Sequence, residues 1–174
     1  QFISEGADFL DVGGESTRPG SQPVPEEEEM RRVLPVVEGL ARRGALVSID
    51  TRRATVARAA LDAGARIVND VSALRDDPGM LPLIVERQVP VVLMHRRGRP
   101  EDGYAGAKYR DVVEDVRQFL IERALDCQNA GIAAANIAVD PGIGFGKQPD
   151  EDLTLIAGTG RLAAAGHRVL VGAS

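Results

Sequence analysis

A chain of 174 residues is long enough for one domain with a sizeable core, since a chain of this size buries about 70% of its unfolded surface. Its 26 acidic residues against 21 Lys and Arg give a net charge of −5, which argues against a general nucleic-acid surface. No apolar run approaches the ~20 residues that cross a bilayer, and the single cysteine, Cys127, excludes an internal disulfide. We therefore expect a cytoplasmic protein without nucleic-acid or membrane partners.

Short apolar runs alternate with longer amphipathic stretches along the chain. They are continuous rather than strictly alternating, which is typical of parallel strands that are covered on both faces. The six strands that we expect are residues 8–15, 45–50, 66–70, 89–95, 136–140 and 167–174.

Three of the intervening stretches predict covering helices. Residues 25–44 begin with four glutamates, which favour the positive end of a helix dipole. Residues 55–65 include Gly64 near their end, and residues 110–131 stop at Gly131; both glycines are typical of left-handed helix caps. Cys127 falls on the apolar face of the last of these helices, so we expect it in the core.

Strands that alternate with helices predict a parallel α/β sheet, either closed as a (β/α)8 TIM barrel or open and doubly wound. The strand ends favour the barrel, because nearly all of them are polar and a barrel brings them to one mouth. A barrel needs eight units and ~250 residues. We therefore expect residues 1–174 to be a single domain, a barrel fragment with about six of the eight units and incomplete at both ends; a natural six-unit open sheet is the alternative. The polar strand ends are Glu15, Asp50, Asn69 with Asp70, His95, Asp140 and Ser174.

Three of these strand-end residues are candidates for binding a ligand. Asp50 and Asp140 each need a hydrogen-bond partner, because burying an unpaired charge costs several kcal/mol. Each also has a simple explanation, as a helix cap or as an acceptor for amides of its own loop. Together with Asn69 they suit a heterocycle that presents adjacent N–H donors and ring acceptors.

Two loops carry further candidates. In GGESTRPG, residues 13–20, Arg18 is either an anion contact or a surface arginine in a mobile loop, and loops over barrel mouths often act as lids. In DPGIGFGK, residues 140–147, the glycine spacing matches neither a dinucleotide site nor a P-loop. That loop is either an ordinary turn or a close approach to a flat ligand, with Phe145 as an apolar wall.

Outside these loops the sequence offers less. The arginines at 96, 97 and 99, next to His95, predict either a phosphate or carboxylate patch or solvated charge. His167 precedes a strand and so belongs to the opposite, stabilising face of a barrel. No metal-ligand spacing and no supported Ser-His-Asp set is present in the sequence.

The motifs DVGGESTRPG, SIDT, NDVSAL, LMH, DPGIGFGK and VLVGAS, in that order along the whole chain, closely resemble dihydropteroate synthases. The resemblance implies a TIM-barrel transferase of folate biosynthesis, which joins 6-hydroxymethyl-7,8-dihydropterin pyrophosphate to p-aminobenzoate and releases pyrophosphate. It implies that Asp50 and Asp140 are catalytic, because buried carboxylates stabilise the cation left when pyrophosphate departs. The implied pterin-binding residues are Asp50, Asn69, Met94 and Asp140.

The resemblance also implies a site for p-aminobenzoate and its lid. Its residues are Thr17, Arg18, Pro19, Gly144, Phe145 and Ser174. Mg2+ is implied on the pyrophosphate, with the family's metal ligand in an N-terminal segment that this chain lacks, so we expect no metal ligand here. The resemblance further implies a homodimeric full-length protein and a sulfonamide target, and we expect the fragment alone to be inactive.

Two alternatives remain beside the synthase. A methyltetrahydrofolate-dependent methyltransferase shares the pterin-binding barrel, but it has no reason to keep an STRPG lid. A non-catalytic pterin-binding paralogue would keep the ring-binding residues and lose the anion-binding ones.

Overall fold

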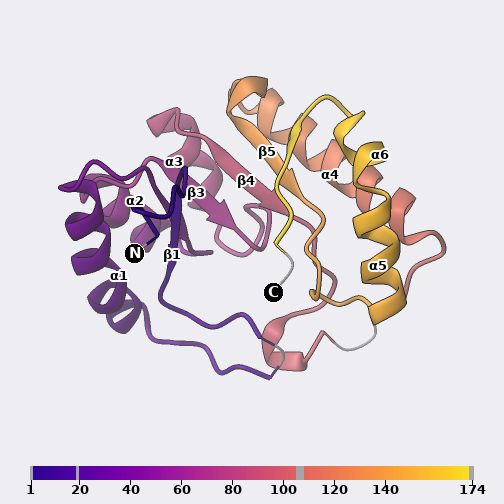
Figure 1. Ribbon diagram of the computed structural model, residues 1–174, viewed down its shortest axis with the longest axis horizontal. Coiled ribbons are helices and arrows are strands. Elements are labelled where there is room, and N and C mark those ends of the chain that lie inside the picture. The colour runs from indigo at the N-terminus through magenta and orange to yellow at the C-terminus, as the bar shows by residue number, and fades with distance from the viewer. Residues whose placement is uncertain (1, 19, 105–107, 173–174) are drawn as a thin grey trace.

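Six parallel strands form one sheet in the computed structural model, which describes residues 2–18, 20–104 and 108–172. Each strand pairs with the next one along the chain (Figure 1). This consecutive order confirms the barrel topology, because a doubly wound sheet reverses its strand order at a switch point. The strands are Leu10–Gly13 (β1), Val47–Asp50 (β2), Ile67–Asp70 (β3), Val91–Met94 (β4), Ile137–Asp140 (β5) and Arg168–Val169 (β6).

Helices connect the strands and lie along the outer side of the curved sheet (Figure 1). The three predicted helices are confirmed, with ends that shift by a few residues. Three further helices, of 8, 9 and 5 residues, were not predicted. The helices are Glu26–Ala41 (α1), Ala54–Asp62 (α2), Met80–Arg87 (α3), Val112–Asn129 (α4), Pro149–Ala157 (α5) and Thr159–Ala163 (α6), with 3-10 turns at Pro100–Asp102 (η1) and Ala134–Asn136 (η2).

The two faces of the sheet differ in chemistry. Successive residues of a strand point to opposite faces, and laterally paired residues of parallel strands share a face. One face packs against the helices and forms the core, with Val47, Ile49, Val68, Val91, Leu93, Ile137 and Val139 all buried. The other, inner face therefore carries the alternate residues, which include the polar groups of β1, β2 and β3.

The helix ends at Gly64 and Gly131 confirm the predicted caps. Both glycines have positive φ, +114° and +109°. The residue after each one donates to the carbonyl five positions back, Ala65 to Ala60 and Ile132 to Cys127, as in a Schellman motif. Cys127 is 0% exposed, as its helical position predicted, and burial raises the pKa of its thiol. In the described part of the chain no helix is both long and apolar enough to cross a membrane.

The packing of α1 on β1 generates a stability prediction for two glycines. A Cβ on Gly14 would lie 2.9 Å from the side chains of Glu29 and Val33, whereas one on Gly39, inside α1, would meet nothing within 4 Å. Gly14→Ala should therefore lower the free energy of unfolding by about 1–3 kcal/mol. Gly39→Ala should raise it by about 0.5–1 kcal/mol through helix propensity. Denaturant unfolding of both variants checks this, and equal signs would contradict it.

Candidate active site

The carboxyl ends of the strands bring the predicted ligand-binding residues together. In the strand register Gly13 pairs with Asp50 and Asp50 with Asn69, so these residues form one row on the inner face. On the same face Met94 pairs with Asp140. The four residues assigned to the pterin from the sequence thus lie on one face of four adjoining strands, β2 to β5.

Asn69 shows that an acidic residue of β1 also belongs to this face. Its Nδ2 donates to Asp11 Oδ2 at 2.9 Å, across β2. Its Oδ1 is buried and has no hydrogen-bond partner among the described residues. Sequence reasoning missed Asp11; the signal was an acid two residues before Gly13, at the spacing that shares a strand face.

The inner face is strongly acidic. Burial, together with the charges of Asp11 and Asp70, raises the pKa of Asp50 to about 8. Burial also raises the pKa of Asp140 to about 6, against the opposing effects of the Gly142 amide and Lys147. A ligand that offers hydrogen-bond donors or positive charge stabilises the ionised form of carboxyl groups whose pKa is raised in this way.

Two other polar strand ends have structural roles. Asp70 is 0% exposed on the outer face, and its carboxylate accepts from the amides of Ser72 and Leu74 at 2.7 and 3.1 Å. His95 is buried, with its ring edge-on to Phe119. Burial, with the charge of Lys147, lowers its pKa to about 2, so His95 is neutral and does not exchange protons near pH 7.

A hydrogen bond to a helix end or to the residue's own loop explains only one of the two aspartates. The first amide of α2, at Ala54, donates to Asp77 Oδ2 at 2.8 Å, so Asp50 does not cap that helix. Asp140 does accept from an amide of its own loop, Gly142, at 2.7 Å. Asp140 is therefore held by its loop, whereas no cap explains Asp50.

Two loops face each other at the same mouth. The β1 loop, residues 14–25, and the β5 loop, residues 141–148, border a hollow of about 370 Å³. We call it the lid hollow; its lining is Glu15, Ser16, Thr17, Arg18, Ile143, Gly144 and Phe145. The structure therefore places four of the six residues assigned to p-aminobenzoate around one space. The other two, Pro19 and Ser174, lie outside the described residues.

Lys147 organises the β5 loop, a role that the sequence did not reveal. Its Nζ donates to the carbonyls of His95, Gly142 and Phe145 at 3.1, 2.7 and 3.2 Å. Burial lowers its pKa to about 7, and the nearby Asp152 opposes that shift. One ammonium thus fixes the end of β4 and both sides of the glycine-rich turn. The motif spacing only excluded a P-loop and gave no sign of this contact.

A network of ion pairs surrounds the mouth. Its most buried member is Glu29, 1% exposed, which accepts from Thr51 Oγ1 at 2.7 Å and pairs with Arg53. Arg53 also bonds Glu15 at 2.8 Å. The desolvation of Glu29 is therefore compensated by a cation and a hydroxyl. This rim ion-pair network consists of Glu15, Glu29, Arg52, Arg53, Asp76, Arg96 and Glu101.

Arg96 corrects the expectation for the arginines after β4. It is 4% exposed and bonds Asp76 at 2.6 Å and the Val71 carbonyl at 3.1 Å. Arg97 pairs with Asp115 at 3.1 Å and stacks on the Tyr109 ring at 4.2 Å. Arg96 is thus buried in an ion pair and is neither a free anion contact nor solvated charge, whereas Arg97 is partly exposed and Arg99 is exposed. Sequence spacing could not show this, because their partners lie on other loops.

The fold and site together define a class of protein. It is an α/β-barrel protein whose acidic and amide groups line the carboxyl ends of adjoining strands, beside a hollow between the β1 and β5 loops. Such a site suits a flat, nitrogen-rich ligand. Residues 1–174 match the pterin-binding enzymes, and the chain belongs to that family.

The relatives and solved structures agree with this placement. The chain is 47% identical over 174 residues to the dihydropteroate synthase of Mycobacterium leprae, covering 99% of this chain and 61% of that protein. It is 51% identical over 173 residues to a probable bifunctional folylpolyglutamate synthase/dihydropteroate synthase of Haloferax volcanii, covering 99% of this chain and 20% of that one. The structure of Xanthomonas albilineans dihydropteroate synthase with 4-aminobenzoic acid matches with a TM-score of 0.93 and 46% identity, over 99% and 61% of the two chains. The chain thus spans less than two thirds of the length of these relatives.

The raised pKa of Asp50 generates a prediction for the pH dependence of stability. Folded Asp50 keeps its proton up to about pH 8, whereas its ordinary pKa is 3.8, so the folded state binds more protons between these values. Its contribution to stability is therefore greatest below pH 4 and falls as the pH rises towards 8. Asp50→Asn removes the titrating carboxyl, and with it the fall in stability between pH 4 and pH 8.

The gain in unfolding free energy from Asp50→Asn should be larger at pH 8 than at pH 5, by at least about 1 kcal/mol. Denaturant titrations of wild type and variant from pH 5 to 8 measure it. A constant difference across that range would contradict the assignment.

Proposed function

We propose that this chain is the substrate-binding part of a dihydropteroate synthase. The enzyme joins 6-hydroxymethyl-7,8-dihydropterin pyrophosphate to p-aminobenzoate, forming 7,8-dihydropteroate and releasing pyrophosphate. One observation carries the proposal: the row of Asp50 and Asn69, with Asp140 nearby, lies at the same strand ends as the lid hollow. Two sites at one mouth are what a condensation of two flat substrates requires.

The solved structures support both halves of the proposal. The dihydropteroate synthase of Xanthomonas albilineans has been solved with 4-aminobenzoic acid and with 7,8-dihydropteroate. The second of these matches this chain with a TM-score of 0.87 at 42% identity. The proposed substrates and product of this chain are transferred from those relatives.

The acidic inner face fits the pterin. A pterin ring presents N–H donors along one edge, and Asp50, Asp140 and the unpartnered Oδ1 of Asn69 offer acceptors. Donors from the ring would lower the raised pKa values of both carboxyls, because hydrogen bonds to the charged form favour it. Binding therefore converts an unfavourable cluster of acids into a set of paired carboxylates.

The same carboxylates suit the chemistry. When the bond between the exocyclic methylene and pyrophosphate breaks, positive charge is left on the dihydropterin. Asp50 and Asp140 stabilise that charge from fixed positions at the strand ends. The amine nitrogen of p-aminobenzoate then forms the new C–N bond and loses a proton. None of these steps needs a nucleophilic side chain of the protein.

We propose that Mg2+ binds together with the pyrophosphate substrate. Among residues 2–18, 20–104 and 108–172, no group of three or more His, Cys, Asp or Glu side chains could hold a metal ion. We therefore assign none of these residues to a metal ion. Mg2+ is proposed as a companion of the pyrophosphate, where it offsets the negative charge.

The lid hollow favours the synthase over the methyltransferase. Thr17 and Arg18 line one side of the lid hollow, and Gly144 and Phe145 line the other. Its volume of about 370 Å³, next to the strand ends that carry Asp50 and Asp140, leaves space for a second substrate. A methyltransferase acting on a bound pterin has no use for that second space. A non-catalytic paralogue would keep both spaces, and only an activity measurement separates it from the synthase.

The remaining parts of the proposal concern the whole protein. A cytoplasmic location fits the single cysteine, Cys127, which is buried in the core. A homodimer is proposed from the family resemblance. The lid hollow is also the proposed sulfonamide target, since the dihydropteroate synthase of Yersinia pestis has been solved in a complex with a sulfonamide drug.

Pyrophosphate release tests the proposed reaction. A polypeptide of the relatives' length that contains this chain should release pyrophosphate from the dihydropterin substrate with Mg2+, and only when p-aminobenzoate is present. Residues 1–174 alone should release none. Pterin binding without release by the longer polypeptide would contradict the synthase and leave a binding protein.

Two substitutions should separate the two substrate sites. Asp140→Asn should weaken pterin binding by about 2–5 kcal/mol, because ring donors would face an amide. Arg18→Ala should raise the KM for p-aminobenzoate while leaving pterin affinity unchanged, because Arg18 lines the lid hollow and is exposed. Calorimetry for the pterin and steady-state kinetics for p-aminobenzoate measure the two effects. Equal losses of both affinities in either variant would contradict the division.

A further inference from the structure

Tyr104 connects the two walls of the lid hollow. It lies two residues after η1 in the segment that follows β4, of which residues 95–104 are called the β4 loop here, and it is 5% exposed. Its hydroxyl donates to the backbone carbonyl of Thr17, in the β1 loop, at 2.6 Å. Its ring meets that of Phe145, in the β5 loop, edge to face with centroids 5.7 Å apart. One side chain from a third loop thus contacts both loops that border the hollow.

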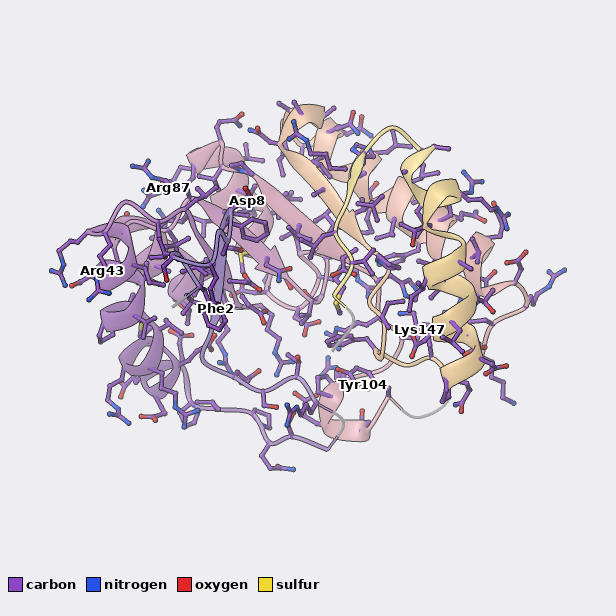
Figure 2. All side chains as sticks on the ribbon, viewed as in Figure 1. Phe2, Asp8, Arg43, Arg87, Tyr104 and Lys147 are labelled. Carbon is purple, nitrogen blue, oxygen red and sulfur yellow. The ribbon has the colours of Figure 1, made fainter. Side chains whose placement is uncertain are left out.

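The figures show how this arises. In Figure 1 the loop after β1 runs along the lower edge of the molecule to the segment around η1. Tyr104 lies at that edge in Figure 2, between the β1 loop and the side where Lys147 lies. A second tie joins the same two segments, since the Gly20 amide donates to the Pro100 carbonyl at 2.7 Å.

The surrounding backbone is shaped to accept Tyr104. A Cβ on Gly98 would lie 2.9 Å from the Cα of Tyr104, and a Cβ on Gly146 would lie 2.4 Å from the Arg97 carbonyl and 3.4 Å from the Cβ of Tyr104. Tyr104 itself has φ of +60°, a left-handed conformation that a bulky residue rarely adopts. Such a conformation persists only where surrounding contacts hold it, and it is typical of functional sites.

The hydroxyl remains a donor throughout the working pH range. Burial raises the pKa of Tyr104 to about 12. The acceptor is a backbone carbonyl, so this bond fixes the course of the β1 loop whatever the side chain of Thr17 does.

We propose that Tyr104 is a positioning residue for the second substrate: it holds the β1 loop at a fixed distance from the Phe145 wall and so sets the width of the lid hollow for a flat aromatic amine. This inference rests on the proposed function of the hollow. It assigns Tyr104 no contact with the reacting atoms. Loss of its hydroxyl should therefore weaken binding of p-aminobenzoate and spare the pterin, because the acidic row on β2, β3 and β5 does not touch it.

Tyr104→Phe tests the proposal, with Tyr109→Phe as a matched control. Both variants lose one hydroxyl from a buried or partly buried ring in the same region of the chain, and the Tyr109 hydroxyl has no partner among the described residues. In the longer polypeptide, Tyr104→Phe should raise the KM for p-aminobenzoate about fivefold, as expected for one net hydrogen bond. The KM for the dihydropterin substrate should stay at the wild-type value, and the melting temperature should fall by no more than about 4 °C, the shift expected for one net hydrogen bond. Tyr109→Phe should leave both KM values unchanged.

A second readout does not depend on activity. Amide hydrogen exchange at Gly20 should be faster in Tyr104→Phe than in wild type or Tyr109→Phe, because the β1 loop loses the hydroxyl bond that lies beside the Gly20 amide bond to the β4 loop. Unchanged exchange would overturn the connection itself. Faster exchange with an unchanged KM for p-aminobenzoate would overturn the positioning role. If wild type fails to release pyrophosphate, the proposed function fails, and the exchange measurement alone decides whether Tyr104 holds the loop.

Discussion

Lateral pairing of parallel strands is the constraint on which this site depends. Residues that pair across parallel strands lie on the same face, so the register of β1, β2 and β3 aligns Gly13, Asp50 and Asn69 in one row. A shift of one residue would turn these groups towards the helices and Asp70 towards the mouth. The core residues Ile49 and Val68, on the opposite face, fix that register because they can be buried on only one side. The apolar core and the acidic site are thus two consequences of the same pairing.

The acids of the protein fall into two electrostatic groups. Around the rim, Glu29 and Glu15 form ion pairs with Arg53, so the cost of their burial is compensated within the folded chain. On the inner face, neither Asp50 nor Asp11 forms an ion pair with a described residue, and burial and the charges of Asp11 and Asp70 raise the pKa of Asp50. The rim acids hold loops in place, whereas the acids of the inner face can still accept hydrogen bonds from a ligand. Stability lost at Asp50 is what a donor-rich ligand can recover on binding, so the site trades stability for affinity.

The sequence predicted what depends on local pattern and missed what depends on contacts between distant loops. Helix caps at Gly64 and Gly131 and the buried Cys127 follow from periodicity and glycine placement, and the structure confirms them. The predicted strand ends were less accurate, since β1 ends at Gly13, two residues before Glu15. The family resemblance supplied the substrate roles, which the pattern of residues alone left open. The contacts of Lys147 and Tyr104 could not be found this way, because their partners are backbone carbonyls, which carry no sequence signal.

Arg96 shows the same limit from the opposite side. Three arginines in four residues indicate a solvated or anion-binding loop, yet Arg96 is buried against Asp76 and the Val71 carbonyl. The difference lies in the rim network, where Asp76 is shared with Arg52, which in turn bonds Glu15 and Glu101. Each of these acids belongs to a different loop, so the network links the loops that follow β1, β3 and β4. Together with Tyr104 it makes the β4 loop the common support of both walls of the lid hollow, although that loop contributes no residue to its lining. Substitutions in the β4 loop can therefore reshape the lid hollow without changing any residue that lines it.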